Sequence, residues 1–183
     1  MIIGLSGYAQ SGKDTVAGML IGLHGYDNRA FANGVRALAY ELDPIVDAFT
    51  EDSAIYLSSW VDEKGWEKSK VSEPEIRRIL QRLGVGARTV IGENVWVDLA
   101  MKGLQPEDKV VITDVRFPNE AQAIKDLNGE IWRIQRPGVL PVNNHPSETS
   151  MDDWKFDKVL INNAGLDQLK SQIASNLGVD SVV

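Results

Sequence analysis

The glycine-rich segment GYAQSGKDT near the N-terminus constrains the fold of this chain more than any other feature. The apolar run Ile2–Ser6 comes directly before it and predicts a short strand, and Thr15–Leu23 predicts a helix directly after it. Gly7, Gly12 and Lys13 match the pattern G-x-x-x-x-G-K, in which loop N–H groups and a helix N-terminus surround a phosphate group. A glycine turn with a solvated lysine is the alternative, but the flanking strand and helix favour a phosphate-binding loop.

One position departs from the general pattern. The residue after the lysine is Asp14 instead of Ser or Thr, and Thr15 follows one residue late. A hydroxyl at this position gives Mg²⁺ a neutral oxygen, whereas a carboxylate offers an anionic oxygen, directly or through water. Thr15 still has a hydroxyl for a phosphate. Asp14 is therefore either a metal-linked residue or a carboxylate that only favours the helix N-terminus.

A second carboxylate follows the apolar run Lys109–Asp114, KVVITD. Such a run is typical of a parallel strand buried on both faces. Asp114 at its end is placed to hold Mg²⁺ across from the glycine loop, and Arg116 is placed to contact the same phosphates. The alternative roles for Asp114 are a helix cap or an ion pair with Arg116.

Strands and helices alternate along the chain, which predicts an α/β fold with a parallel sheet of about five strands, covered on both faces. Ligands of such sheets bind at the carboxyl ends of the strands. The further expected strands are Asn28–Phe31, Lys109–Asp114, Glu130–Gln135 and Lys158–Ile161. The further expected helices are Val35–Val46, a helix after a Ser72/Glu75 capping box, Glu93–Leu104 burying Trp96, Leu99 and Ala100, Asn119–Leu127 and Leu166–Leu177.

Two segments have weak periodicity. Glu51–Lys70 is interpreted as an irregular or partly helical insertion, and Pro137–Trp154 as a loop-rich excursion. Arg133, Arg136 and His145 lie in or beside that excursion, where a lid would close over a transferring phosphoryl group. His145 and Glu148 form either a pair of side chains that acts as a base in proton transfer, or a surface hydrogen bond.

Arginines are plentiful in the middle of the chain. A second phosphate group needs bidentate cationic donors, which guanidinium supplies better than ammonium. Exposed arginines are also commonly just solvated. Those that the pattern leaves off the apolar helix faces are Arg36, Arg77, Arg78, Arg82 and Arg88.

Composition excludes several classes of function. At 183 residues we expect one domain. The net charge of −7 argues against a general nucleic-acid binder, and the absence of cysteine excludes disulfides and thiolate chemistry. No apolar run approaches the roughly 20 residues that span a bilayer, and the N-terminus lacks signal-peptide features, so we expect a cytoplasmic protein without membrane partners.

Taken together, several segments resemble the deoxynucleoside monophosphate kinases encoded by bacteriophages. The resemblance covers most of the chain, with Glu51–Lys70 as the weak stretch, and GKDT is a habitual spelling of the loop in that family. The segments are SGYAQSGKDT, RRILQRLGVGART, ENVWVD, VVITDVRFPNEAQAI, WRIQRP, HPSE and DKVLINNAGLDQL.

The resemblance implies a three-layer P-loop kinase fold and Mg²⁺-dependent transfer of the γ-phosphoryl group of ATP to a deoxynucleoside monophosphate. It implies acceptor-binding helices at about 34–104 and a lid at about 136–154, in the host cytoplasm if the chain is phage-encoded, and it is consistent with a homodimer. ATP would be held by Gly7, Gly12, Lys13, Asp14, Thr15, Asn162 and Asn163, with Asp14 and Asp114 at the metal and Lys13, Arg116 and Arg136 as catalytic residues. The acceptor candidates are Arg36, Arg77, Arg82, Arg88, Trp96 and Asp98.

Two other functions stay open at this stage. One is another small-molecule kinase of the same fold, such as a dephospho-coenzyme A or phosphomevalonate kinase. The other is a non-catalytic nucleotide-binding module that regulates a partner. The arginine-rich helix and the VRFPNE segment favour the nucleotide kinase, because a regulatory module has no reason to carry so many arginines near a second site.

Overall fold

The computed structural model describes residues 1–48, 53–141 and 146–179. The chain divides into two compact units. The sheet unit comprises Met1–Phe31 and Met101–Val183, and the helical unit comprises Ala32–Ala100. The expected single domain, with acceptor helices and a lid, stays a prediction. In the part of the chain that the structure describes, no helix is long and apolar enough to cross a membrane.

A parallel sheet organises the sheet unit. Its described strands follow the order β2-β5-β1-β6-β7, so β1 lies at the centre between β5 and β6. All four neighbouring pairs are parallel, which confirms the predicted α/β sheet. The strands are β1 (Ile2–Ser6), β2 (Asp27–Arg29), β5 (Val110–Ile112), β6 (Glu130–Gln135) and β7 (Lys158–Ile161).

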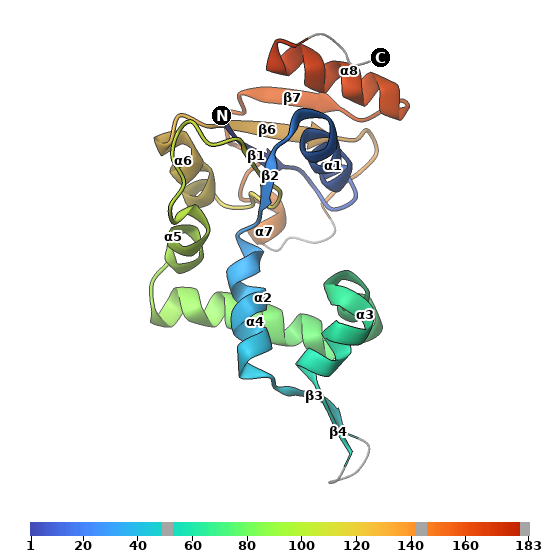
Figure 1. The fold of residues 1–183 in the computed structure, drawn as a ribbon, viewed down its shortest axis with the longest axis vertical. Helices are drawn as coiled ribbons and strands as arrows, with labels where there is room; N and C mark the ends of the chain where they lie inside the picture. Colours follow the sequence, from blue (N-terminus) through green and yellow to red (C-terminus); the bar gives the residue numbers. More distant parts are fainter. Residues whose placement is uncertain (49–52, 142–145, 180–183) are drawn as a thin grey trace. The chain divides into compact units, whose positions relative to one another are not determined.

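Helices pack on both faces of this sheet. On one face, Val16 and Leu20 of α1 (Lys13–His24) join Ile173 of α8 (Leu166–Leu177) in a core cluster with Ile3 and Leu5 of β1. Figure 1 shows α8 running beside β7. On the other face lies α6 (Pro118–Asp126), and the short α7 (Pro146–Thr149) comes before β7 in the chain. Because both faces are covered, every residue of β1 is buried.

The helical unit has its own core. It contains α2 (Ala32–Leu42), α3 (Leu57–Ser72), α4 (Pro74–Val90), most of α5 (Val95–Met101), and an antiparallel ribbon of β3 (Ile45–Ala48) and β4 (Ala54–Tyr56). Ala39, Leu57 and Ile76 are fully buried in one apolar cluster, so α2, α3 and α4 pack together. A non-helical backbone at Gly65 (φ 73°) divides α3 into two shorter helices.

Most predicted elements are confirmed. The strands at Ile2–Ser6, Glu130–Gln135 and Lys158–Ile161 and the helix at Leu166–Leu177 have the predicted bounds. The apolar face of α4 is confirmed as well: Ile76 is buried, its partners on that face are partly buried, and Arg77, Arg78 and Arg82 are exposed.

The second predicted helix is shorter than expected. We predicted a helix over Val35–Val46, but α2 ends at Leu42 and Val46 lies in β3. Asp43 takes a positive φ of 42°, and Pro44 follows. A proline disfavours helical backbone at the residue before it and has no N–H to donate, which accounts for the early end.

The described part of Glu51–Lys70 confirms the partly helical alternative, because it forms β4 and most of α3. Two further expectations were wrong in detail. Ser72 does not cap α4: it ends α3 and accepts a hydrogen bond from Trp60 Nε1 (3.2 Å), while Glu73 caps α4 by accepting from the Glu75 N–H (3.0 Å). In α5, Trp96 is buried as expected, but Leu99 is 51% exposed.

Tight packing at the centre of the sheet gives a test of this core. A methyl group added at Gly4 would lie 2.7 Å from Ile124 Cδ1 and 2.8 Å from Val115 Cγ2, beneath α6. Gly4→Ala should therefore lower the free energy of unfolding by about 1–3 kcal/mol, the typical cost of overpacking. Urea unfolding measures this change.

Gly22→Ala is the matched control. Gly22 lies in α1, and a methyl group there meets no atom within 4 Å. Replacing a helix glycine by alanine should raise stability by roughly 0.5–1 kcal/mol. Equal effects of the two variants would contradict the packing of α6 over β1.

Candidate active site

The glycine loop between β1 and α1 has no room for larger side chains. Gly7 has φ 150° and Gly12 has φ 105°, values that other residues rarely adopt. A Cβ at Gly7 would collide with the Ile134 carbonyl oxygen of β6, and one at Gly12 would collide with the Asn162 side chain. Both glycines are therefore required where the backbone passes the ends of neighbouring strands.

Asn162 ties this loop to the end of β7. Its side-chain Nδ2 donates to the Ser11 carbonyl oxygen (2.9 Å), and its backbone N–H donates to the Gln135 carbonyl oxygen (2.8 Å). The family resemblance assigned Asn162 to the residues that hold ATP. The structure gives it a contact that the sequence did not indicate, since it holds the glycine loop in place.

Lys13 begins α1 and reaches back over the loop. Its Nζ donates to the carbonyl oxygens of Gly7 (2.6 Å) and Tyr8 (2.8 Å). Burial and, after it, the nearby guanidinium of Arg116 lower the pKa of Lys13 to about 8. The lysine is therefore held where a bound phosphate group would favour its charged form.

Arg116 lies beyond the end of β5, as the sequence predicted. Its backbone N–H and that of Phe117 donate to one Glu120 oxygen (2.7 and 3.0 Å), and Glu120 is buried. Its side chain lies 3.9 Å from Glu148 of α7. We did not predict the role of Glu120, although FPNE, with Pro at the first helical position and Glu two residues later, is a recognisable helix start.

These side chains line one pocket at the carboxyl ends of β1, β5 and β6. The pocket is lined by Ser6, Gly7, Ala9, Lys13, Val115, Arg116, Arg133, Glu148 and Met151. Three of these residues are cations and one is a carboxylate. The arrangement suits an anionic ligand, because local charge attracts such a ligand even when the whole protein is acidic.

The two predicted metal residues are in suitable chemical settings. Asp14 is exposed in the first turn of α1, next to exposed Thr15. Asp114 is half-buried and accepts the Phe31 N–H (2.8 Å) at the end of β2. Among the described residues, no group of three or more His, Asp or Glu side chains is placed to hold a metal ion. A cation here would thus take further oxygens from a ligand and water, as Mg²⁺ does in phosphate sites.

Three other predicted residues have weaker links to the pocket. Asn163 is exposed beside Asn162. Arg136 is exposed just beyond β6, and the β6 arginine that lines the pocket is Arg133. His145 lies outside the described residues, so the proposed pair of His145 with Glu148 stays a prediction.

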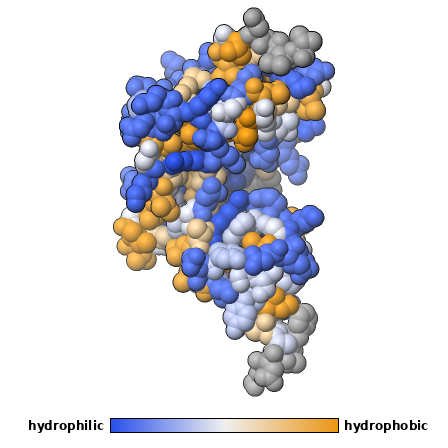
Figure 2. Space-filling model, in the orientation of Figure 1, coloured by the Kyte–Doolittle hydropathy of each residue, from blue (hydrophilic) through white to orange (hydrophobic). Residues whose placement is uncertain are grey.

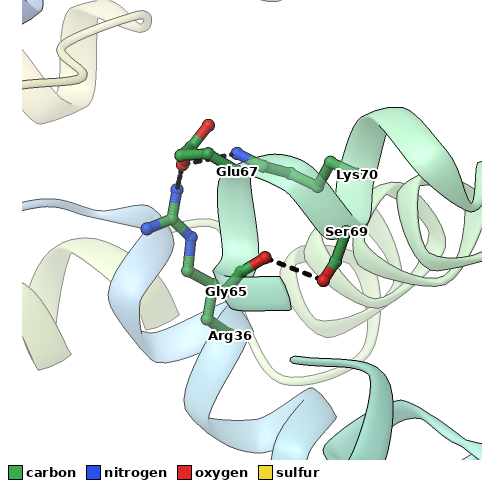
Figure 3. A network of polar contacts seen from close by, with 5 residues as sticks. All are labelled: Arg36, Gly65, Glu67, Ser69 and Lys70. Carbon is green, nitrogen blue, oxygen red and sulfur yellow. Dashed lines mark hydrogen bonds and ion pairs between the residues drawn. The ribbon is translucent and has the colours of Figure 1, made fainter. Parts of the chain in front are cut away.

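The predicted acceptor residues belong to the helical unit, where Arg36 is part of a small ion-pair network. Arg36 Nη2 and Lys70 Nζ both lie close to Glu67 Oε1 (3.0 and 2.9 Å; Figure 3). Partial burial opposes ionisation, but the hydrogen bonds and charges of Lys70 and Arg36 hold the pKa of Glu67 below its usual value. Arg36 is therefore already paired.

The other acceptor candidates lie along α4 and α5. Arg77 and Arg82 are exposed and Arg88 is half-buried. Trp96 is buried and its indole N–H donates to the Gly84 carbonyl oxygen (2.9 Å), so this side chain packs α5 against α4. Asp98 is exposed and lines a shallow hollow with Ile91. Hydrophobic residues gather around this end of α4, where Val90 and Ile91 are 84% and 69% exposed (Figure 2).

The glycine loop joins the central strand of a parallel sheet to a helix that starts with a lysine, and further cations lie at the neighbouring strand ends. This arrangement defines a P-loop nucleotide-binding protein. Residues 48–173 match the deoxynucleotide monophosphate kinase family. The chain belongs to this family.

The relatives include viral proteins. A putative deoxynucleotide monophosphate kinase of Acanthamoeba polyphaga mimivirus is 33% identical, over 96% of this chain and 95% of its own length. The deoxynucleoside-5'-monophosphate kinase of Escherichia phage T5 is 28% identical, over 53% of this chain and 43% of its own. A solved dephospho-CoA kinase from Campylobacter jejuni is 14% identical with a TM-score of 0.47, over 97% of this chain and 95% of its own.

The lowered pKa of Lys13 predicts a proton uptake on ligand binding. Above pH 8 the free lysine loses its proton, because its pKa is about 8. A bound polyphosphate favours the ammonium form, so ATP binding at pH about 9 should take up a fraction of a proton. Calorimetric titrations in buffers of different ionisation enthalpy measure this uptake.

Lys13→Met is the control for that measurement, because it removes the titrating group and keeps a side chain of similar length. The uptake should disappear in this variant, provided that residual binding is measurable. The same uptake in Lys13→Met and in the unmodified protein would show that another group is responsible.

Proposed function

We propose that this protein transfers the γ-phosphoryl group of ATP to a deoxynucleoside monophosphate, giving ADP and the deoxynucleoside diphosphate. The observation that supports this most strongly is the fixed glycine loop, with Lys13 and Arg116 around one cationic pocket. Family membership supports the choice of acceptor. ATP is the donor that kinases of this class use.

The reaction needs little covalent chemistry from the protein. An oxygen of the acceptor phosphate attacks the γ-phosphorus, and the bond to the bridging oxygen breaks, so that the electron pair leaves with ADP. Lys13 turns from the loop carbonyls to the phosphates and, with Arg116, neutralises the charge that spreads over the moving group. Arg136 would join them when the lid closes and excludes water.

The loop fits a phosphate group on structural grounds. The space that a Cβ would need at Gly7 and Gly12 is taken by neighbouring backbone and side chain, so the loop approaches its ligand through bare backbone. Oxygens around this end of α1 come from Asp14, Thr15 and Asp114. Asn163 follows Asn162, the residue that holds the glycine loop in place. When bound, Mg²⁺ would neutralise phosphate charge, with Asp14 and Asp114 directly or through water.

We propose that the guanidinium groups of α2 and α4 bind the phosphate of the acceptor monophosphate. Arg77, Arg82 and Arg88 lie on α4 in the helical unit, and Arg36 would exchange Glu67 for a phosphate. Trp96 and Asp98 would border the base. A homodimer and action in the cytoplasm of a host cell remain predictions from the resemblance.

An acceptor panel tests the proposed function. ADP formation from ATP should depend on Mg²⁺ and rise only when a deoxynucleoside monophosphate is added. Lys13→Ala should lower kcat by at least about 100-fold, or on the order of 3 kcal/mol, because charge stabilisation in the transition state is lost. A coupled ADP-release assay measures both.

The control for this variant is Lys155→Ala, which removes an exposed lysine outside the pocket and should leave turnover unchanged. Dephospho-coenzyme A and phosphomevalonate belong in the acceptor panel. Turnover with one of these and with no nucleotide would contradict the proposal, and nucleotide binding without any acceptor-dependent turnover would favour a regulatory module.

Asp14 has a test of its own. If its carboxylate assists Mg²⁺, Asp14→Ser should raise the Mg²⁺ concentration at half-maximal rate by several-fold, because an anionic oxygen is replaced by a neutral one. Rates over a magnesium titration measure this shift. An unchanged titration curve would assign Asp14 to the helix N-terminus alone.

A further inference from the structure

The sequence placed Arg133 beside the lid-like excursion but not among the predicted site residues, whereas the structure places it in the pocket. It lies in β6 beside Ser6 of the central strand, one register step before the glycine loop begins. Its side chain is only 13% exposed and lines the pocket together with Lys13 and Arg116. An arginine in the interior strand of a sheet is costly to bury unless it is paired or has a ligand.

Two aromatic rings and one carboxylate hold this guanidinium. Its carbon lies 4.5 Å from the centre of the Tyr8 ring and 5.3 Å from that of Phe156. Its Nη2 donates to Asp152 Oδ1 (3.0 Å), and the Tyr8 hydroxyl donates to the same oxygen (2.9 Å). Tyr8 belongs to the glycine loop, so the loop itself orients the arginine.

The bond to Asp152 leaves further N–H groups of the guanidinium for a ligand. Burial and the hydrogen bond to Asp152 raise the pKa of the Tyr8 phenol, so it stays a donor to the carboxylate at neutral pH. Asp152 is not among the residues that line the pocket, whereas Arg133 is. The carboxylate thus fixes the arginine from outside the pocket.

Charge around the pocket is the second observation. Lys13, Arg116 and Arg133 line it, and Glu148 is its one lining carboxylate among the described residues. In a chain with a net charge of −7, such a local excess of cations is unfavourable without an anion. Arginine also matches phosphate oxygens in a planar, bidentate geometry that lysine does not offer.

We propose that Arg133 binds a phosphate group of the bound ATP, and that Tyr8 and Asp152 are positioning residues that aim its guanidinium into the pocket. The inference rests on the proposed function for the identity of the ligand. It assigns to Arg133 a contact that the sequence pattern had suggested for Arg136, which lies exposed beyond the strand.

Calorimetric ATP binding to three variants tests the proposal. Arg133→Gln should weaken ATP binding by about 10–100-fold, as expected for the loss of a charge-assisted hydrogen bond to phosphate. Asp152→Asn breaks the same ion pair from the other side but keeps an acceptor for Nη2, so ATP binding should stay equal or become tighter. Lys155→Gln, with the same loss of charge outside the pocket, should bind ATP normally.

Unfolding temperatures of the same variants separate a ligand role from a structural one. Both Arg133→Gln and Asp152→Asn remove the ion pair, so both should lose some stability. Equal losses of ATP affinity in these two variants would overturn the proposal, because Arg133 would then only hold Asp152 in place. Unchanged ATP affinity in Arg133→Gln, or no ATP binding to the unmodified protein, would overturn it as well.

Three further variants complete the design. Arg133→Lys keeps the charge and serves if Arg133→Gln does not fold: it should bind ATP more weakly than the unmodified protein, and unchanged affinity would overturn the proposal. Tyr8→Phe keeps the ring and should bind ATP nearly normally, whereas Tyr8→Leu should weaken binding several-fold by freeing the guanidinium. ATP binding with no phosphate transfer to any acceptor would contradict the proposed function and leave the assignment of Arg133 standing.

Discussion

The close approach of the glycine loop to the ends of β6 and β7 is the constraint on which the site depends. The loop passes the Ile134 carbonyl group at Gly7 and the Asn162 side chain at Gly12, with no space for a Cβ at either position. The hydrogen bond from Asn162 to the Ser11 carbonyl oxygen holds it there. Because β1 is the central strand and is buried on both faces, the start of this loop is fixed by the core of the sheet unit.

Electrostatics then decides what such a loop can bind. Lys13 is held against the loop carbonyls with its pKa lowered to about 8, first by burial and then by the charge of Arg116. Arg116 follows β5 and Arg133 lies in β6, the two strands on either side of β1. Three cations thus converge on one pocket of an acidic protein, and phosphate oxygens are the ligands that relieve their repulsion.

Local patterns predicted the sheet unit well. The apolar runs of β1, β6 and β7 and the glycine loop are short-range signals, so their positions and the α/β class followed from the sequence. The rule that ligands bind at the carboxyl ends of parallel strands predicted from the sequence that Lys13 and Arg116 lie at one site.

Contacts between distant residues could not be predicted in the same way. Tyr8 and Asp152 are 144 residues apart, and no periodicity links them. Asn162 was assigned to ATP by the family resemblance, and nothing in its sequence neighbourhood indicates the bond to Ser11. In the helical unit, α2 ends before Asp43 and Pro44, earlier than its apolar spacing suggested. The segment before Lys70 has weak periodicity because its helix is divided by the non-helical backbone at Gly65.

The central claim is that the glycine loop and the strand ends around it form the ATP site. Hydrogen exchange followed by mass spectrometry, with and without Mg²⁺ and ATP, tests it most directly. The account predicts slower exchange in peptides that cover Gly7–Thr15, the Asp114–Arg116 segment and the end of β6. Protection confined to the helical unit, with the glycine loop exchanging at its ligand-free rate, would contradict the account.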